Sequence, residues 1–386
     1  MKITNDIKYI GVNDHNIDLF EGQYIVKDGI SYNSYVIMDD KICVVDTVDK
    51  NFKDEWLNNL DKTLEGKSPY YLLIQHMEPD HSANILNFME KYPNTVIVSS
   101  TIAFNMMKNF FNTAFEDKRL VVKENDTLSL GKHTLQFVGA PMVHWPEVIM
   151  TYDTYDKALF TADGFGKFGI DSSPTIDWKQ EARRYYIGIV GKFGKQVDAV
   201  LNKALSLDIK KILPLHGPVL DDNLGYYIDL YKHWANYIPE EKGIMIAYTS
   251  VYGNTKMAIE YLCDQLKGQK VKVFDLARCD ISEAVSYAFG YDRLVLATTT
   301  YNSDVFPFMK EFINHLTERN FQNRKVALIE NGTWAPLANK TMLKMLENSS
   351  NIEYIEPKVT IKSALSEENK KELEQLAINL IGGGQC

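Results

Sequence analysis

Cysteine is scarce in this chain of 386 residues, which contains only Cys43, Cys263, Cys279 and Cys386. The four are widely spaced and form no Cys-x-x-Cys pair. Small zinc or iron modules held by thiolates need such closely spaced pairs, so the sequence provides no module of that kind. Candidate metal ligands must therefore be sought among histidines and carboxylates.

Long apolar runs and basic tracts are also missing. No run is long enough to span a membrane, and the polar start Met1–Tyr9 lacks the apolar core of a signal peptide, so we expect a cytoplasmic protein. A net charge of −9 without a dense basic tract argues against nonspecific binding to nucleic acid. With 45% hydrophobic residues, the chain has material for two sizeable cores.

Four potential metal ligands lie in one short stretch, directly after the apolar run 70–74, which is typical of a buried strand. Because Pro79 disfavours helical geometry at the residue before it, we expect His76 and Glu78 on an extended segment, pointing to the same side. They can share one metal ion. Asp80 and His81 precede a run with helical spacing, 83–89, and can share a second ion.

Three further candidates repeat this placement at the ends of apolar runs. His144 follows 135–142, Asp163 ends 158–162 and His216 follows 212–215. A single histidine is more often structural than a ligand, but seven candidates in this arrangement favour a binuclear metal site. The remaining histidines have no such setting, and we expect them to be solvated or structural; they are His15, His133, His233 and His315.

The pattern resembles the metallo-β-lactamase-like fold, whose hydrolases carry two zinc ions on a His-x-His-x-Asp-His loop followed by His, Asp and His. Glu78 stands where those hydrolases have their second histidine. A carboxylate is a harder ligand than imidazole and suits iron that cycles between two oxidation states better than zinc. The family with this substitution is the flavodiiron proteins, also called A-type flavoproteins. The resemblance implies an αββα sandwich with two iron sites, one held by His76, Glu78, His144 and Asp163, the other by Asp80, His81, Asp163 and His216.

A second, flavodoxin-like domain is implied by the same resemblance. From Gly243 onward, five apolar strands alternate with helical segments, which predicts a doubly wound five-stranded parallel sheet. The apolar helix 226–237 gives way to a polar linker, and we place the boundary there, between a diiron domain, 1–242, and an FMN domain, 243–386. The predicted strands are 244–248, 271–276, 294–298, 326–329 and 352–361.

The loop after the first of these strands has small polar residues around Gly253 and leads into a helix. It lacks the lysine of a nucleotide-triphosphate loop and the three glycines of a dinucleotide fingerprint, so a terminal monophosphate such as that of FMN fits best. The alternative is an ordinary polar turn. Two later loops end strands on the same sheet edge and, by resemblance, flank the flavin ring. The predicted FMN contacts are Ser250, Val251, Tyr252, Gly253, Asn254, Thr255, Thr300, Tyr301, Asn302, Asn331, Gly332, Thr333 and Trp334.

The N-terminal part is expected to complete the metal domain with a hairpin of strands, 32–37 and 42–47, turned at Asp39–Asp40. Asp46 is predicted to be structural and to orient ligands from behind. Tyr24 lies where the family has residues near the substrate pocket, and we assign it no catalytic role. No catalytic residue is expected beyond the iron ligands.

The expected function is reduction of dioxygen to water, nitric oxide to nitrous oxide, or both, with electrons passed through FMN. Dioxygen is favoured, but the sequence leaves the choice open. The family implies a separate rubredoxin or similar small donor, because no rubredoxin module is present, and a head-to-tail homodimer or a dimer of dimers. The basic segment 167–195 is a candidate docking face, with a solvated helix as the alternative; its cations include Lys179, Arg183, Arg184 and Lys192.

Two other classes of protein remain open. One is a dinuclear zinc hydrolase fused to a flavodoxin-like domain, against which Glu78 speaks. The other is an electron-transfer flavoprotein with a vestigial metal domain, against which the complete ligand set speaks.

Overall fold

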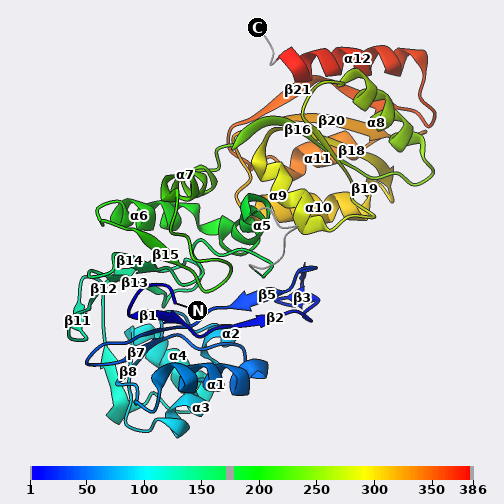
Figure 1. Ribbon diagram of the computed structural model, residues 1–386. Helices are drawn as coiled ribbons and strands as arrows, with labels where there is room; N and C mark the ends of the chain where they lie inside the picture. The colour runs from blue at the N-terminus through cyan, green and yellow to red at the C-terminus, as the bar shows by residue number, and fades with distance from the viewer. Residues whose placement is uncertain (1, 171–177, 383–386) are drawn as a thin grey trace. The chain divides into compact units, whose positions relative to one another are not determined.

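The computed structural model of the protein describes residues 2–170 and 178–382, and its backbone divides into two compact units (Figure 1). The first comprises Met1–Tyr186 and Phe193–Lys232, the second Ile187–Lys192 and His233–Cys386. The change at residue 233 lies ahead of the predicted boundary at 242. The segment Ile187–Lys192 belongs to the second unit although both of its neighbours in the chain belong to the first. Within the second unit, the Tyr237 hydroxyl donates to the Gly191 carbonyl of this segment at 2.9 Å.

The first unit is built on two stacked sheets. The first sheet has the order β1 (Ile7–Tyr9), β6 (Tyr35–Ile37), β7 (Cys43–Val45), β8 (Tyr71–Leu73), β9 (Val96–Ser99) and β10 (Arg119–Val121). The second has the order β11 (Thr127–Ser129), β12 (Thr134–Gly139), β13 (Ile149–Asp153), β14 (Ala158–Phe160) and β15 (Lys211–Leu213). The predicted hairpin is confirmed, since β6 and β7 pair antiparallel with Ile37 opposite Cys43.

The core of this unit lies between the two sheets. Val45, Leu73 and Val98 of the first sheet are fully buried in one cluster with Phe137 and Phe160 of the second. Helices cover the outer faces, so the predicted αββα sandwich is confirmed (Figure 1). The described helices of this unit are α1 (Lys53–Leu64), α2 (Pro79–Ser82), α3 (Ile85–Lys91), α4 (Thr101–Phe111), α5 (Trp178–Tyr185), α6 (Gly194–Ala204) and α7 (Leu224–Ala235), of which the short α2 belongs to the loop after β8.

Two short ribbons flank the sandwich. Strand β2 (Val12–Asp14) pairs with β5 (Ile30–Tyr32), and β3 (Leu19–Phe20) pairs with β4 (Tyr24–Ile25). In the second ribbon Phe20 and Tyr24 are buried while Leu19 and Ile25 are exposed, because side chains alternate across a strand. The buried side of this ribbon thus faces the interior of the unit.

The second unit contains the predicted five-stranded parallel sheet. Its order is β17 (Val271–Asp275), β16 (Glu241–Tyr248), β18 (Tyr291–Tyr301), β20 (Arg324–Asn331) and β21 (Ile352–Ile361), the flavodoxin-like order. The short β19 (Asp304–Val305), which the sequence did not predict, pairs antiparallel with β18.

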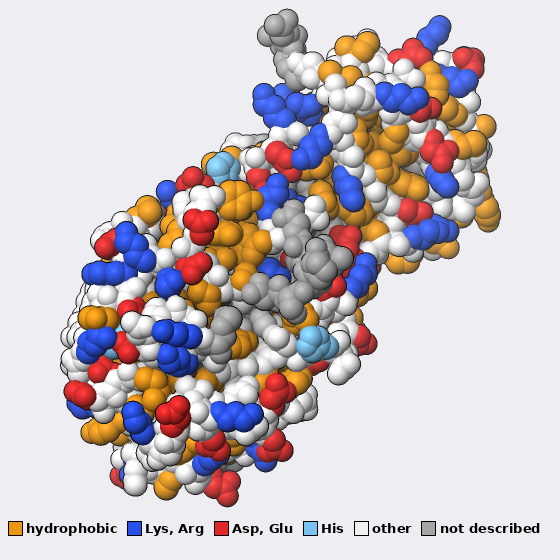
Figure 2. All heavy atoms as spheres, in the orientation of Figure 1, with side chains coloured by type: hydrophobic (Ala, Val, Ile, Leu, Met, Phe, Trp, Pro, Cys, Tyr) orange, Lys and Arg blue, Asp and Glu red, His pale blue; other side chains and the backbone are white. Residues whose placement is uncertain are grey.

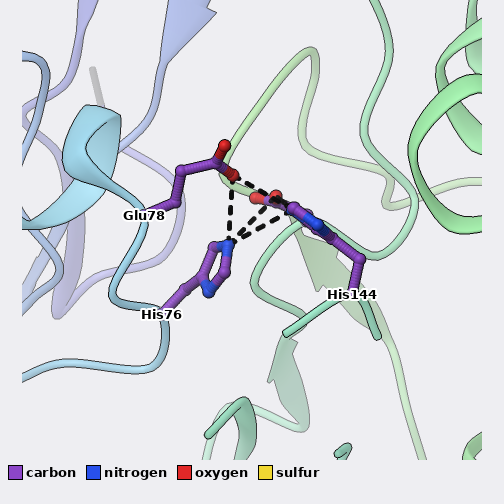
Figure 3. A group of neighbouring side chains, drawn as sticks. His76, Glu78 and His144 are labelled. Atoms are coloured by element: carbon purple, nitrogen blue, oxygen red, sulfur yellow. Dashed lines mark hydrogen bonds and ion pairs between the residues drawn. The ribbon is translucent and has the colours of Figure 1, made fainter. Parts of the chain in front are cut away.

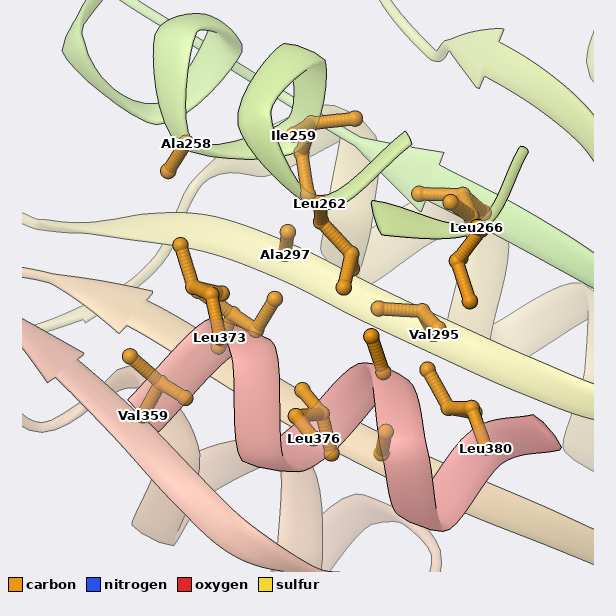
Figure 4. Close-up of a cluster of buried hydrophobic side chains, with 14 of the residues drawn as sticks. Ala258, Ile259, Leu262, Leu266, Val295, Ala297, Val359, Leu373, Leu376 and Leu380 are labelled. Carbon is orange, nitrogen blue, oxygen red and sulfur yellow. The ribbon is translucent and has the colours of Figure 1, made fainter. Parts of the chain in front are cut away.

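Helices cover both faces of this sheet. On one face α8 (Asn254–Gln265) and α12 (Glu367–Gly382) pack on the strands through leucines such as Leu262, Leu373 and Leu376, all fully buried (Figure 4). Truncating one of these leucines to alanine costs about 2–5 kcal/mol of stability. The other face carries α9 (Ile281–Gly290), α10 (Pro307–Glu318) and α11 (Ala338–Met345). Because the five strands run parallel, their carboxyl ends and the loops that follow them lie at the same edge of the sheet.

The helices and the surface both bear on the expectations about membranes and nucleic acid. Among the described helices, none combines the length and apolarity that a bilayer crossing requires. On the face drawn in Figure 2, basic and acidic side chains are interspersed rather than separated by sign.

Candidate metal centre and flavin pocket

The loop after β8 carries the first four candidate ligands in the predicted geometry. Glu78 is extended, with φ −57° and ψ 138°, and α2 begins at Pro79. Proline at the first helical position supplies a suitable φ and lacks the N–H that would be unpaired there. His76 and Glu78 therefore approach from the strand side, while Asp80 and His81 project from the helical turn.

His76, Glu78 and His144 form one group of donors, in which the His76 and His144 rings point toward the Glu78 carboxylate (Figure 3). Glu78 Oε2 lies 3.3 Å from His76 Nε2 and 3.0 Å from His144 Nε2. Asp163 completes the group, with Oδ2 at 2.9 Å from His144 Nε2 and 3.5 Å from His76 Nε2.

Asp80, His81 and His216 form the second group. The Nε2 atoms of the two histidines are 3.0 Å apart, and each lies 3.3 Å from Asp80 Oδ2. The other oxygen of Asp163, Oδ1, lies 3.4 Å from His81 Nε2 and 3.9 Å from His216 Nε2. Asp163 thus presents one carboxylate oxygen to each group. The structure brings all seven predicted residues together.

These donors fit a pair of metal ions. Both carboxylate oxygens of Asp80 and Oδ1 of Asp163 are buried without a hydrogen-bond partner among the described residues. Leaving buried carboxylate oxygens unsatisfied is costly, and a cation between the donors removes that cost. Imidazole and carboxylate donors, without thiolate, match non-haem iron.

In the cluster, burial and neighbouring charges shift the pKa values of the donors in opposite directions. Burial alone would raise the pKa of Asp163, but the His76 and His144 imidazoles overcome it and hold that pKa well below its usual value. Burial opposes protonation of His144, yet hydrogen bonds to Asp163 and Glu78 raise its pKa to about 9. Protons therefore compete with metal ions for these nitrogens, and metal binding releases protons.

A second layer of groups holds the donors. Asp46, fully buried with its pKa raised to about 6 by burial, accepts from the Gln75 backbone N–H at 2.8 Å and from Gln75 Nε2 at 3.0 Å. This contact fixes the start of the ligand loop, as the sequence predicted. His216 Nδ1–H donates a hydrogen bond to the Ser31 carbonyl at 2.7 Å.

Sequence reasoning missed two residues of the site. Glu147 lies 2.8 Å from His76 Nδ1, and its position three residues after His144 was the only signal. Tyr185 is fully buried; burial first, and then the charge of Asp163, hold its pKa well above the usual value. Its hydroxyl has no hydrogen-bond partner among the described residues. No sequence signal marks Tyr185, which comes 22 residues after Asp163 on a separate helix.

The predicted docking segment needs a correction. Lys167, Arg183 and Arg184 are buried, so neither a docking face nor a solvated helix describes them. The Arg184 guanidinium instead donates to the Ile25 carbonyl at 3.0 Å and pairs with Glu181. Residues 171–177 of this segment, like Cys386, lie outside the described residues.

His133, one of the four histidines expected to be solvated or structural, is buried and therefore not solvated. It is fully buried between Asp153 Oδ2, 2.8 Å from its Nδ1, and Asp6 Oδ2, 3.2 Å from its Nε2. Asp6 also pairs with Lys132, so a cation already faces this cluster.

At the sheet edge of the second unit lies a cavity of about 500 Å³. Twelve of the thirteen predicted FMN residues line it, and Gly253, the remaining one, lies in its phosphate loop with φ +93°. The hydroxyl of Thr255 is buried without a hydrogen-bond partner among the described residues, which fits a phosphate acceptor. The cavity is also lined by Thr299, Ser303 and Ala335, which belong to the two loops expected to flank the flavin ring. Sequence reasoning missed two lining residues, Leu337 and Ser363.

Several predicted flavin side chains hold the loops themselves. Ser250 Oγ accepts from the backbone N–H of Gly253 at 3.1 Å, and Thr300 Oγ1 accepts from that of Leu337 at 2.9 Å. Tyr252 and Trp334, in contrast, are 94% and 91% exposed. The cavity therefore combines fixed backbone with exposed aromatic rings.

Fold and site together define a class: a two-domain protein that joins a binuclear centre in a metallo-β-lactamase-like unit to a flavodoxin-like unit. Residues 30–217 match the family described as ODP family beta lactamase, and residues 245–375 match a flavodoxin domain. The anaerobic nitric oxide reductase flavorubredoxin of Vibrio vulnificus is 31% identical over 346 residues, covering 86% of this chain and 70% of that protein. The chain belongs to the flavodiiron protein family.

Solved structures agree on the fold. The rubredoxin oxygen:oxidoreductase of Desulfovibrio gigas superposes with a TM-score of 0.91 at 23% identity, covering 99% of this chain and 98% of that one. The flavodiiron protein of Giardia intestinalis gives 0.90 at 24% identity, covering 98% and 95%. Family membership makes this protein an oxidoreductase whose cofactors are FMN and a non-haem diiron centre.

Proposed function

We propose that this protein reduces dioxygen to water, nitric oxide to nitrous oxide, or both, with electrons delivered through FMN from a small donor protein. The observation that carries the proposal is the placement of Asp163, which presents one oxygen to each of two donor groups. A bridging carboxylate holds two metal ions close enough to bind one small substrate between them.

The proposed ligands follow the two groups. His76, Glu78, His144 and Asp163 hold one iron, and Asp80, His81, Asp163 and His216 hold the other. Three carboxylates in the set offset much of the charge of two ferrous ions in a buried site. When bound, the iron pair and the flavin each supply two electrons to the substrate.

Four electrons match the reduction of one dioxygen, and two of them suffice for one pair of nitric oxide molecules. Reduction of one dioxygen to two waters consumes four electrons and four protons. Reduction of two nitric oxide molecules to nitrous oxide and one water consumes two electrons and two protons. We propose that the buried Tyr185 hydroxyl, which has no hydrogen-bond partner among the described residues, donates a hydrogen bond to a substrate held between the two donor groups. The buried Phe20 ring, 5.4 Å from that of His216, excludes water beside it.

For the flavin, we propose that loop 250–255 holds the phosphate and that loops 300–302 and 331–334 contact the ring system. The positive end of α8 and the buried Thr255 hydroxyl support the phosphate position. Tyr301 and Trp334 are proposed to contact the faces of the ring.

Substrate choice and electron donor rest on the relatives. The similar sequences are named as nitric oxide reductases, and one similar structure as a rubredoxin oxygen:oxidoreductase, so we propose both gases as substrates and a rubredoxin-like donor. A cytoplasmic location remains part of this proposal. The test is the consumption of each gas by the reduced protein supplied with rubredoxin. If neither gas is consumed by protein loaded with iron and FMN, the proposal fails.

Metal analysis separates this proposal from the two alternatives. About two irons and one FMN per chain support the oxidoreductase, whereas zinc without iron supports a hydrolase and FMN without metal supports an electron carrier. The analysis uses protein purified without added metal.

We further propose that the active form is a head-to-tail homodimer, alone or paired as a dimer of dimers. Dilution below the dissociation constant of the dimer should then lower turnover per chain. Undiminished turnover in a protein shown to be monomeric by light scattering would contradict this arrangement.

A further inference from the structure

Glu147 is a buried carboxylate that sits behind one of the proposed iron ligands. It is 2% exposed, and its Oε1 accepts two hydrogen bonds, from His76 Nδ1 and from the Met77 backbone N–H, both at 2.8 Å. Its other oxygen, Oε2, has no partner among the described residues. Burying a carboxylate that is only half satisfied destabilises a fold, so stability does not account for this residue.

The contact decides which nitrogen of His76 carries the proton. A carboxylate can only accept, so Nδ1 must be the donor and the lone pair of Nε2 is left toward Glu78 and His144. His216 is held in the same way by the Ser31 carbonyl. His81 differs, because its Nδ1 has no hydrogen-bond partner among the described residues.

Glu147 also ties two ligand loops together. It follows His144 by three residues, while its side chain reaches the loop that carries His76. One backbone contact reinforces this tie, since the Ile149 N–H donates to the Gln75 carbonyl at 3.2 Å. Glu147 itself is held by Ser100, whose Oγ donates to the Glu147 carbonyl at 3.0 Å. The distance between the two loops is thus set partly by one carboxylate.

We propose that Glu147 is a positioning residue for the metal centre, which fixes the Nδ1–H tautomer of His76 and the spacing of the His76 and His144 loops. It touches neither substrate nor metal in this role. The inference rests on the proposed function, because it takes His76 as a ligand. Loss of such a partner typically weakens metal binding about 10- to 100-fold.

The first unit contains a matched pair that serves as a control. His133 Nδ1 lies 2.8 Å from Asp153 Oδ2, both side chains are fully buried, and neither belongs to the seven candidate ligands. Glu147→Gln and Asp153→Asn therefore make the same chemical change, from carboxylate to amide beside a buried imidazole. They differ in whether that imidazole is a proposed ligand.

The experiment uses the full chain with FMN bound and zinc as a redox-inert probe, titrated against a chromophoric chelator. We expect Glu147→Gln to bind zinc about 10- to 100-fold more weakly than wild type and Asp153→Asn to bind it as wild type does. A second readout is the reduction potential after loading with iron. Removing a negative charge behind His76 disfavours the ferric state, so the potential should rise in Glu147→Gln and stay unchanged in Asp153→Asn.

Zinc affinity of Glu147→Gln at the wild-type level would overturn the inference, and so would equal losses in both variants. Bound FMN and circular dichroism report folding. If Glu147→Gln does not fold, Glu147→Asp replaces it, because it keeps the charge but shortens the arm by one methylene; wild-type affinity in that variant would also overturn the inference. Wild-type protein that binds two zinc ions, yet reduces neither gas when loaded with iron and FMN, contradicts the proposed function and leaves the role of Glu147 standing.

Discussion

The candidate metal centre and the flavin pocket are both built at strand ends, yet they differ in how their side chains are held. In the metal centre His76, His81 and His216 are fully buried, and groups such as Asp46 hold the ligand loop from behind. In the flavin pocket Tyr252 and Trp334 are more than nine-tenths exposed. The side chains of the first site are fixed by packing, whereas the second site has a backbone held by buried or half-buried hydroxyls such as that of Ser250 and leaves its aromatic rings exposed.

The difference follows from the ligands each site is proposed to bind. A metal ion needs several donors within a few ångströms, so a small displacement of one imidazole costs affinity. A phosphate is bound by backbone N–H groups of a loop and helix start, and a flavin ring by contact with flat surfaces. Substitutions should therefore act locally and steeply in the metal centre, and through backbone conformation in the pocket.

The largest expected effect comes from Asp163→Ala. This change removes the carboxylate shared by both donor groups, so binuclear iron and gas reduction should be lost, with activity down at least about 100-fold, while FMN stays bound in the other unit. Iron content, gas consumption and flavin absorbance measure the three quantities. Retained binuclear iron and activity would show that the shared Asp163 carboxylate is not needed for the metal centre.

Within the metal centre, His216→Ala should be more damaging than His81→Ala. His216 is anchored through Nδ1 by the Ser31 carbonyl, whereas His81 Nδ1 lacks such an anchor among the described residues, so less of the preorganised geometry depends on His81. The measurement is the iron retained per chain after incubation with a chelator. Equal loss in the two variants would show that the anchor does not matter.

The flavin pocket is probed best through its backbone. Gly253 has φ +93°, a conformation in which a Cβ costs about 1–2 kcal/mol, so Gly253→Val should weaken FMN binding about tenfold and leave iron content unchanged. Gly268→Val is the matched control, since Gly268 has φ +87° and, like Gly253, open space where a Cβ would stand. If both variants lost FMN equally, strain in the unit rather than in the loop would be responsible.

The smallest effect is expected from His133→Gln, which should change the stability of the first unit but not metal binding, because His133 lies outside the donor set. Burial opposes protonation, but Asp153 and Asp6 outweigh it and raise the pKa of His133. Its contribution to stability is therefore fully present below about pH 6.5, the usual value for histidine, and is lost as pH rises through the raised pKa. The difference in melting temperature between wild type and His133→Gln should shrink with rising pH. A difference that grows with pH would contradict a raised pKa of His133 in the folded protein.

Much of the fold could be predicted because short apolar runs mark buried strands locally and apolar residues at helical spacing mark helices. The ligand loop was predictable for the same reason: Pro79 sets Glu78 extended and starts α2, and both are effects of neighbouring residues. The expectation of exposed cations in 167–195 was wrong for Lys167, Arg183 and Arg184, because a charge pattern does not show which charges are buried, whereas Lys192 is exposed. Arg184 finds its partners in Glu181 and in the Ile25 carbonyl, more than 150 residues away in the chain.

The sequence by itself indicated the seven candidate donors and the candidate phosphate loop and determined the order of the two folds, since each is carried by residue type and short-range spacing. The resemblance already implied that Asp163 belongs to both groups, but only the tertiary structure decided which of its oxygens meets which group, that Glu147 stands beside His76 and that Tyr185 packs against His216. These contacts join segments distant in the chain, and their geometry depends on how strands and loops pack together. Spacing along the sequence does not contain that information.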